Sequence, residues 1–137
     1  MAGHTGDEAA ARALLDDDSP LVRSAALGAL ARLGAVTEED LVAGLADPDP
    51  GVRRRACEVA ATLPGPDLRP LLGDGDPSVV EVAAWALGER GPGSVAAVAD
   101  LAGVATGHED PLCREAAVAA LGAIGDERGL PAILAGL

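Results

Sequence analysis

Apolar and polar positions follow a helical period along this chain, and the same arrangement occurs four times. Each occurrence begins at a proline that closely follows an aspartate and opens a run rich in Ala, Leu and Val. The four runs are Pro20–Leu30, Pro50–Ala60, Pro77–Leu87 and Pro111–Leu121, and their prolines lie 30, 27 and 34 residues apart. A repeat of this length, carried by helix-forming residues, is typical of a solenoid of stacked helices.

The same pattern predicts where the helices begin and end. Proline suits the first turn of a helix because its missing N–H would have no partner there, and the preceding Asp or Ser can cap that turn. About fourteen residues later the helices are expected to end at Gly34, Pro64, Gly91 and Gly125. The intervening segments predict a first helix for each pair, at residues 7–15, 38–46, 68–72 and 94–105, and a last one without a partner at residues 130–136.

These elements predict an all-α fold, a right-handed α-solenoid of about four and a half helical-hairpin repeats. We expect a single domain over residues 7–137, preceded by a disordered segment at residues 1–6. Core positions should recur four residues apart on one face of each second helix. They are Val22, Ala26, Leu30, Val52, Ala56, Ala60, Val79, Ala83, Leu87, Cys113, Ala117 and Leu121.

Composition restricts the core and the partners. Apolar residues make up 49% of the chain, but it has no Phe or Tyr and one Trp, so the core must be built from Ala, Leu and Val in closely packed helices. The net charge is −12, and every basic residue is Arg. Because an acidic surface repels phosphate backbones, we expect no nucleic acid partner and favour a basic protein segment.

The sequence predicts a cytoplasmic protein without membrane association. The first residues show no secretory signal pattern, and no apolar run has the length of a membrane span. Cys57 and Cys113 fall in the second and fourth repeats, too far apart for a disulfide. We expect both to be buried thiols in a reducing compartment.

The motif Asp-Pro-x-Val-Arg-x-x-Ala-x-x-x-Leu-Gly, with Ile124-Gly125-Asp126 closing the last copy, resembles the HEAT-like repeats of the phycobilisome-lyase (PBS lyase) type. The resemblance covers about residues 7–137 and implies a curved solenoid that mostly serves as an interaction scaffold. Within this type some proteins are chromophore lyases or their chaperones, and one group binds alkylated DNA. Deoxyhypusine hydroxylase uses the same repeats to hold iron.

Three residues after the prolines stand Arg23, Arg53 and Arg114, while the third repeat has Val80. The resemblance implies that an arginine here ties to the acidic turn of an adjacent repeat. We therefore expect a structural ladder of charge-assisted hydrogen bonds that is interrupted at the third repeat, with ligand binding by the arginines as the alternative. The expected acidic partners are Asp18, Asp49, Asp76 and Asp110.

Positions four, eight and twelve after each proline are expected to face the inner curve. The only aromatic residue, Trp85, falls on this stripe with Glu81 and Glu89 one helical turn to either side. A tryptophan inside a charged rim has the character of a binding hot spot, but Trp85 could equally pack over Ala119. The candidate binding residues on this concave face are Trp85, Glu81, Glu89, Arg54, Arg55 and Glu58.

The dipeptide His108-Glu109 raises the question of a metal site. The hydroxylase carries its His-Glu pairs four and five residues after the proline, where this chain has no histidine, and the only other histidine is His4. One turn histidine cannot supply the ligand set of an iron or zinc site, so we expect no metal and no cofactor. We also find no nucleophile and base at a recognisable spacing, and so name no catalytic residue.

The sequence therefore predicts a non-enzymatic protein–protein interaction scaffold that binds a partner segment on its concave face. The alternative is an enzyme or enzyme subunit of the HEAT-repeat lyase or hydroxylase (oxidoreductase) kind. The last helix would expose Leu130, Ile133, Leu134 and Leu137 unless something covers them. We expect it to pack inward as a cap on a monomer, rather than to offer an apolar edge to a second copy.

Overall fold

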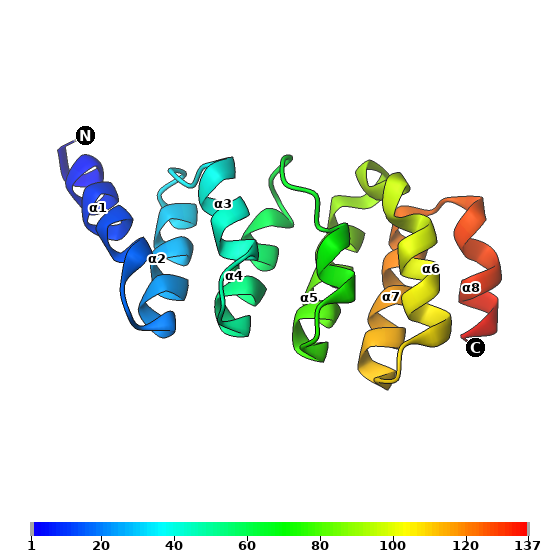
Figure 1. Ribbon diagram of the computed structural model, residues 1–137. Helices are drawn as coiled ribbons and strands as arrows, with labels where there is room; N and C mark the ends of the chain where they lie inside the picture. The colour runs from blue at the N-terminus through cyan, green and yellow to red at the C-terminus, as the bar shows by residue number, and fades with distance from the viewer. Residues whose placement is uncertain (1, 137) are drawn as a thin grey trace.

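The computed structural model describes residues 2–136, with side chains from Gly6 onward, and contains only helices within that range. Helical hairpins follow one another in a row from the N-terminal to the C-terminal end (Figure 1), which confirms the α-solenoid. The α-helices are α1 (Ala2–Ala13), α2 (Pro20–Arg32), α3 (Glu38–Leu45), α4 (Pro50–Ala60), α5 (Pro77–Arg90), α6 (Val98–Gly107), α7 (Pro111–Ile124) and α8 (Leu130–Ala135). Short 3₁₀ turns join them: η1 (Leu14–Asp16), η2 (Arg69–Gly73), η3 (Gly91–Ala97) and η4 (Glu127–Gly129).

Each second helix begins at its predicted proline, with a capped first turn. Asp49 accepts the N–H of Gly51 at 2.8 Å, and Asp110 accepts that of Leu112 at 2.8 Å. At the other end of α7, Gly125 adopts a left-handed conformation with φ 74°, which a residue with a side chain rarely adopts. The predicted elements are thus placed to within a few residues.

The first helix of the third repeat is reduced to the 3₁₀ turn η2. Pro64 and Pro66 precede this turn and Pro70 lies inside it, and proline disfavours a regular α-helix because it lacks the N–H donor. In the fourth repeat the first helix is longer, since η3 runs directly into α6. The repeats therefore differ mainly in their first helices, and the second helices form the regular row.

The core lies on the predicted face of the second helices. All twelve predicted core positions are buried except Val22, which is half-buried because α2 stands near the N-terminal end of the row. Both cysteines are buried and unbridged, and burial raises the pKa of the Cys57 thiol to about 12. Small residues bring helices close: a Cβ on Gly88 of α5 would lie 3.0 Å from the Cα of Ala120 in α7.

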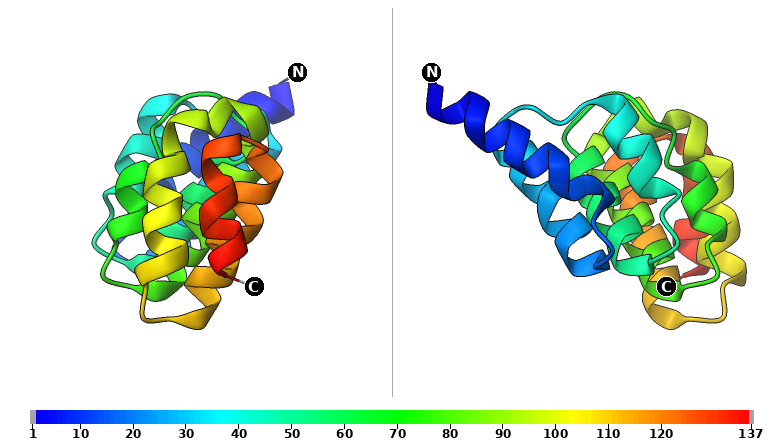
Figure 2. Two further views of the ribbon diagram at one scale, coloured as in Figure 1. Left: turned by 90° about the vertical axis from the view of Figure 1, so that its right-hand side faces the viewer. Right: turned by 60° about the vertical axis from the view of Figure 1, so that its left-hand side comes forward.

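The two ends of the chain differ in part from expectation. Helix α1 starts at Ala2, five residues before the predicted start, and its first turns extend away from the other helices (Figure 2). Met1 lies outside the described residues, and the disorder expected over residues 1–6 stays a prediction.

At the other end, α8 packs on α6 and α7 through Ala132 and Ile133, as expected of a cap. Leu130 and Leu134 stay 51% and 59% exposed, and Leu137 is outside the described residues. The monomeric state stays a prediction. None of the helices between residues 2 and 136 has both the length and the apolar character of a membrane span.

Candidate functional site

A groove runs between α5 and α7 beside the only tryptophan. Its volume is about 320 Å³, and Trp85 forms one wall with 46% of its surface exposed. Glu81 and Glu89, one helical turn before and after Trp85, line the same groove. The lining on the α7 side is Ala116, Ala119, Ala120 and Ala123.

The sequence produces this groove through a mismatch in side-chain size. Trp85 projects from α5 eight residues after the helix-opening proline, while the residue at the same position of α7 is Ala119. The alanines of α7 are too short to fill the space beside the indole, so a channel stays open. Trp85 thus lies beside Ala119, which fits the expectation that it packs there. It also remains half exposed, which fits the expectation that it contacts a partner.

The other candidate binding residues lie elsewhere on the row. Arg54 donates from Nη1 to the Oγ of Ser78 at 2.6 Å and so links α4 to the start of α5. Arg55 donates from Nε to the Oγ of Ser24 on α2 at 3.3 Å and lies 3.9 Å from the carboxylate of Glu58. Neither arginine lines the groove, and neither does Glu58, so the predicted set separates into a groove trio, two arginines that link helices, and Glu58 beside Arg55.

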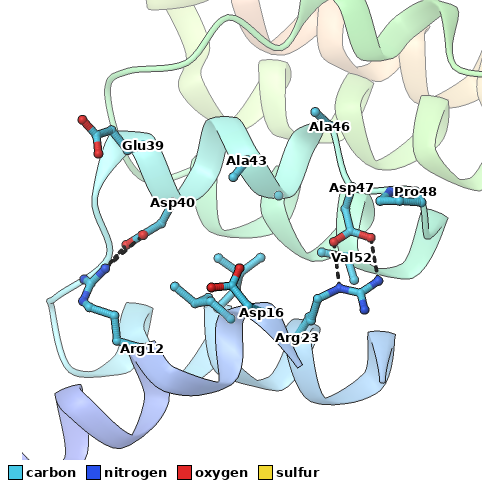
Figure 3. Close-up of a pocket in the computed structure, with 13 residues that line it drawn as sticks. Arg12, Asp16, Arg23, Glu39, Asp40, Ala43, Ala46, Asp47, Pro48 and Val52 are labelled. Carbon is cyan, nitrogen blue, oxygen red and sulfur yellow. Dashed lines mark hydrogen bonds and ion pairs between the residues drawn. The ribbon is translucent and has the colours of Figure 1, made fainter. Parts of the chain in front are cut away.

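The arginine ladder exists, but its carboxylate partners differ from those expected. Arg23 donates from Nε and Nη2 to both carboxylate oxygens of Asp47, each at 2.9 Å (Figure 3). Arg53 donates in the same way to Asp74, at 2.8 and 3.1 Å. The prediction of Asp49 and Asp76 as partners is wrong.

The aspartates directly before the prolines cap their own helices instead, because the unpaired N–H groups of the first helical turn lie within reach of their carboxylates. They are Asp49, Asp76 and Asp110. The carboxylate of Asp18 takes part in no hydrogen bond among the described residues, where Ser19 is the cap. Only the main-chain carbonyl of Asp18 is used, as an acceptor from Arg23 at 3.1 Å.

Each ladder arginine also fastens the turn of its own repeat. The Nη1 of Arg23 donates to the carbonyl oxygens of Asp17 and Asp18. The Nη1 of Arg114 does the same to His108 and Glu109, at 2.7 and 2.9 Å. An arginine three residues after the proline therefore holds its own turn with one nitrogen and offers two further donors to the next repeat.

The residue three before each proline occupies an equivalent place in every turn. The N–H two residues later donates to the side chain of Asp17, Asp47 and Asp74 at 2.9 Å in each case, and to Nδ1 of His108 at 3.0 Å. His108 is therefore the fourth repeat's substitute for a ladder aspartate. Its role in the structure is to shape a turn.

The ladder's charges stabilise one another. The hydrogen bonds from Arg23 lower the pKa of the Asp47 carboxyl, against the opposing effect of desolvation. The side chains of this pair are 18% and 12% exposed, so solvent screens their attraction only in part. Reasoning from the sequence missed Asp47 and Asp74 because each lies two residues from an equally plausible aspartate.

A second hollow, of about 530 Å³, lies between the first two repeats (Figure 3). Arg12 pairs with Asp40 on one side of it, at 3.0 Å, and the Arg23–Asp47 pair closes the other side. Its apolar lining includes Leu15, Leu27 and Val52. Because these arginines and aspartates pair with each other, the hollow has less to offer a ligand than the α5–α7 groove.

Arg90 is a further structural residue with no signal in the sequence. It donates from Nε to the carbonyl of Ala60 at 3.1 Å and from Nη1 to that of Pro66 at 2.9 Å. Burial lowers the pKa of its guanidinium. Arg90 thus ties the end of α5 to the end of α4 and to the loop that replaces a first helix.

Comparison with known families gives matches along most of the chain. A family described as HEAT repeats matches residues 38–106 and 65–137, and a second family, described as HEAT repeat, matches residues 10–37. No curated protein matches the chain. Within residues 6–136, no group of three or more His, Cys, Asp and Glu side chains is placed to hold a metal ion.

Proposed function

Because this chain belongs to the HEAT-repeat family, we propose that it is a non-enzymatic interaction scaffold that binds a partner segment in the groove between α5 and α7. HEAT repeats generally mediate protein–protein interaction. The observation that carries the choice of site is the half-exposed indole of Trp85 beside a lining of alanines. Large aromatic side chains in such settings dominate the energetics of many interfaces.

Burial of the exposed part of Trp85 would supply a useful share of the binding energy. At about 25 cal/mol per Å² of apolar surface, covering the exposed half of an indole contributes on the order of 2 kcal/mol. The small residues of α7 let an incoming apolar side chain lie flat against the ring. The groove therefore suits one central apolar residue of the partner.

The charges at the groove favour a basic partner. Glu81 and Glu89 are eight residues apart on α5, which is about 12 Å along a helix. An extended peptide covers that distance in about four residues. We therefore propose a segment with an apolar residue flanked by two arginines or lysines four positions apart.

Two finer assignments belong to this proposal. The Asp-Pro-x-Val-Arg motif, with Arg23 and Arg53 in the ladder, supports a place among the PBS-lyase-type repeats. The two unbridged thiols suit a reducing compartment such as the cytoplasm.

Trp85 is the only tryptophan, so its fluorescence reports directly on the groove. Titration with a peptide of the sequence type Arg-x-Leu-x-Arg should shift its emission to shorter wavelength, and added salt should weaken binding. The same peptide with glutamates in place of the arginines should not bind.

Calorimetry with variants completes the test. Trp85→Ala and Glu81→Lys should each weaken binding at least tenfold, while Val42→Ala and Glu39→Lys, matched changes on the exposed side of α3, should leave it unchanged. Equal binding of the arginine and glutamate peptides, or full binding by Trp85→Ala with intact helical circular dichroism, would refute the groove as the site.

A further inference from the structure

We infer that the partner segment held in the Trp85 groove carries an acidic residue beyond its basic core, and that two arginines of α2 and α4 bind this residue. The two are Arg32 and Arg55, here called the arginine pair, whose guanidinium groups lie together above Gly28. This inference rests on the proposed function, because it assumes that the segment is held at Trp85. It adds a second contact point, of the opposite charge, to the same segment.

The two arginines reach the same point from different helices. A Cβ on Gly28 would lie 3.5 Å from Nη1 of Arg55 and 3.6 Å from Nη1 of Arg32. Arg55 comes from α4 and donates from Nε to the Oγ of Ser24, one turn before Gly28 on α2. Arg32 lies one turn after Gly28, and long helical side chains point back toward the N-terminus of their helix. Because Gly28 has no side chain, the two guanidinium groups can meet above it.

The carboxylates of the chain leave the arginine pair largely unneutralised. Arg32 is exposed and takes part in no hydrogen bond or ion pair among the described residues. Arg55 has the carboxylate of Glu58 at 3.9 Å, but these side chains are 41% and 50% exposed, and solvent screens such a pair. Two adjacent guanidinium groups repel each other, and a carboxylate bound between them relieves this repulsion. The pair therefore favours an anionic group.

The arginine pair and the Trp85 groove lie on corresponding faces of the second helices. Gly28 and Trp85 each stand eight residues after the proline that opens their helix. Helix α4 lies between α2 and α5 in the row (Figure 1), so the two points are two helix spacings apart. At about 9 Å between neighbouring helices this is about 18 Å, which an extended peptide covers in about six residues. One segment can therefore contact both points.

The two contact points carry opposite charges. Glu81 and Glu89 border the groove, which suits the basic core of the segment. If the segment stayed basic as it crossed α4, the arginine pair would repel it. An acidic residue about six positions beyond the core instead matches the pair, since one carboxylate can accept from both guanidinium groups. The partner segment is therefore bipolar, with a basic core around an apolar residue and an acidic end.

Matched peptides test this arrangement. Each contains the core Arg-x-Leu-x-Arg, a Gly-Ser linker of about eight residues and, at the far end, either two glutamates or two glutamines. The linker leaves the core from its N-terminal end in one pair of peptides and from its C-terminal end in the other, which covers both chain directions. Binding to the full chain is followed by Trp85 fluorescence. In one direction the glutamate peptide should bind about fivefold more tightly than its glutamine counterpart, and added salt should reduce this gain.

Protein variants locate the gain. Arg32→Ala and Arg55→Gln should each remove most of the difference between the glutamate and glutamine peptides. Arg69→Ala, which removes an exposed arginine of η2, should keep the difference. Attraction between the glutamates and the arginines of the peptide itself acts on every variant alike, so it cannot produce this pattern.

The outcomes separate this inference from the proposed function. If the glutamine peptides bind and the glutamates add nothing in either direction, or if the gain persists in Arg32→Ala, the inference is wrong and the groove remains the site. If no peptide binds, both proposals are wrong. If a peptide with the glutamates but without the basic core binds as tightly as the full peptide, the arginine pair is an independent anion site, and the assignment of one segment to both points is wrong.

Discussion

Val80 and His108 occupy the two positions at which a third arginine–aspartate pair of the ladder, here called a rung, would have formed. Val80 occupies the place of the arginine in the third repeat, and His108 occupies the place of the aspartate in the turn that this arginine would reach. Both changes fall on one contact, so no buried charge is left without its partner. The joint between α5 and α7 instead relies on close packing at Gly88 and Ala120.

Rebuilding the missing rung should show this pairing directly. Val80 is fully buried, so Val80→Arg alone buries an unpaired guanidinium and should cost about 3 kcal/mol of unfolding free energy. His108→Asp alone should cost less than about 1 kcal/mol, because an aspartate can accept the same N–H as in the other turns. In the double variant the new pair should recover at least about 1 kcal/mol relative to additivity, measured by urea unfolding. If the cost of the double variant equals the sum of the two single costs, the two new side chains do not pair and the proposed relationship is wrong.

The existing rungs should matter more than the exposed ion pairs. Arg53→Ala removes both guanidinium donors from the carboxylate of Asp74, which is only 9% exposed and keeps only the N–H of Asp76, and should cost about 2 kcal/mol. Arg69→Ala removes an arginine that pairs with Asp67 at the surface and should cost under about 1 kcal/mol. Arg53→Lys should restore only part of the loss, since an ammonium cannot make the bidentate contact. Equal melting temperatures for the Arg53 and Arg69 variants would count against the ladder.

Acid should weaken the first rung. Because the pKa of Asp47 is lowered in the folded chain, its contribution is fully present above the ordinary carboxyl pKa and is lost as pH falls through the folded value. Asp47→Asn should therefore be less stable than wild type at pH 7, and the gap should narrow as the pH falls below the ordinary carboxyl pKa of about 4. Arg23→Ala, which removes the donor, should flatten the profile in the same way. A constant gap in urea midpoints across this range would be inconsistent with the pair.

Two helical glycines form a matched test of packing. Gly88→Ala places a methyl group 3.0 Å from the backbone of α7 and should cost about 1 kcal/mol or more, because two helices must separate. Gly122→Ala meets nothing within 4 Å and should stabilise the chain by about 0.5–1 kcal/mol through helix propensity alone. Thermal unfolding of both variants measures the contrast. The same sign for both would mean that α5 and α7 are not in the close contact described.

The sequence was sufficient to predict the second helices, the prolines at which they begin and the alignment of Trp85, Glu81 and Glu89 along one side of α5, because prolines and helical spacing act locally. That these three residues bind a partner stays a prediction. It was not sufficient to choose between Asp47 and Asp49. Both precede the same proline, and the choice depends on which carboxylate lies above its own helix and which faces the neighbouring repeat.

The directions of Arg54 and Arg55 were beyond prediction for a related reason. These adjacent residues donate to serines on opposite neighbours, α5 and α2, because their partners are set by the offset between repeats. Arg90 gave no signal because its acceptors are main-chain carbonyls, which every residue type provides.

The interrupted ladder makes the solenoid unevenly stiff. Between the first three repeats each arginine grips two successive turns, so bending there must break charged hydrogen bonds. At the joint of α5 and α7 no charged side-chain hydrogen bond is present among the described residues; a hydrogen bond from the Sγ of Cys113 to the carbonyl of Pro77, at 3.1 Å, and the close packing at Gly88 and Ala120 hold the two helices. The Trp85 groove lies at that joint, so a guest that alters the spacing of α5 and α7 breaks no charged pair, whereas the same change between the earlier repeats would.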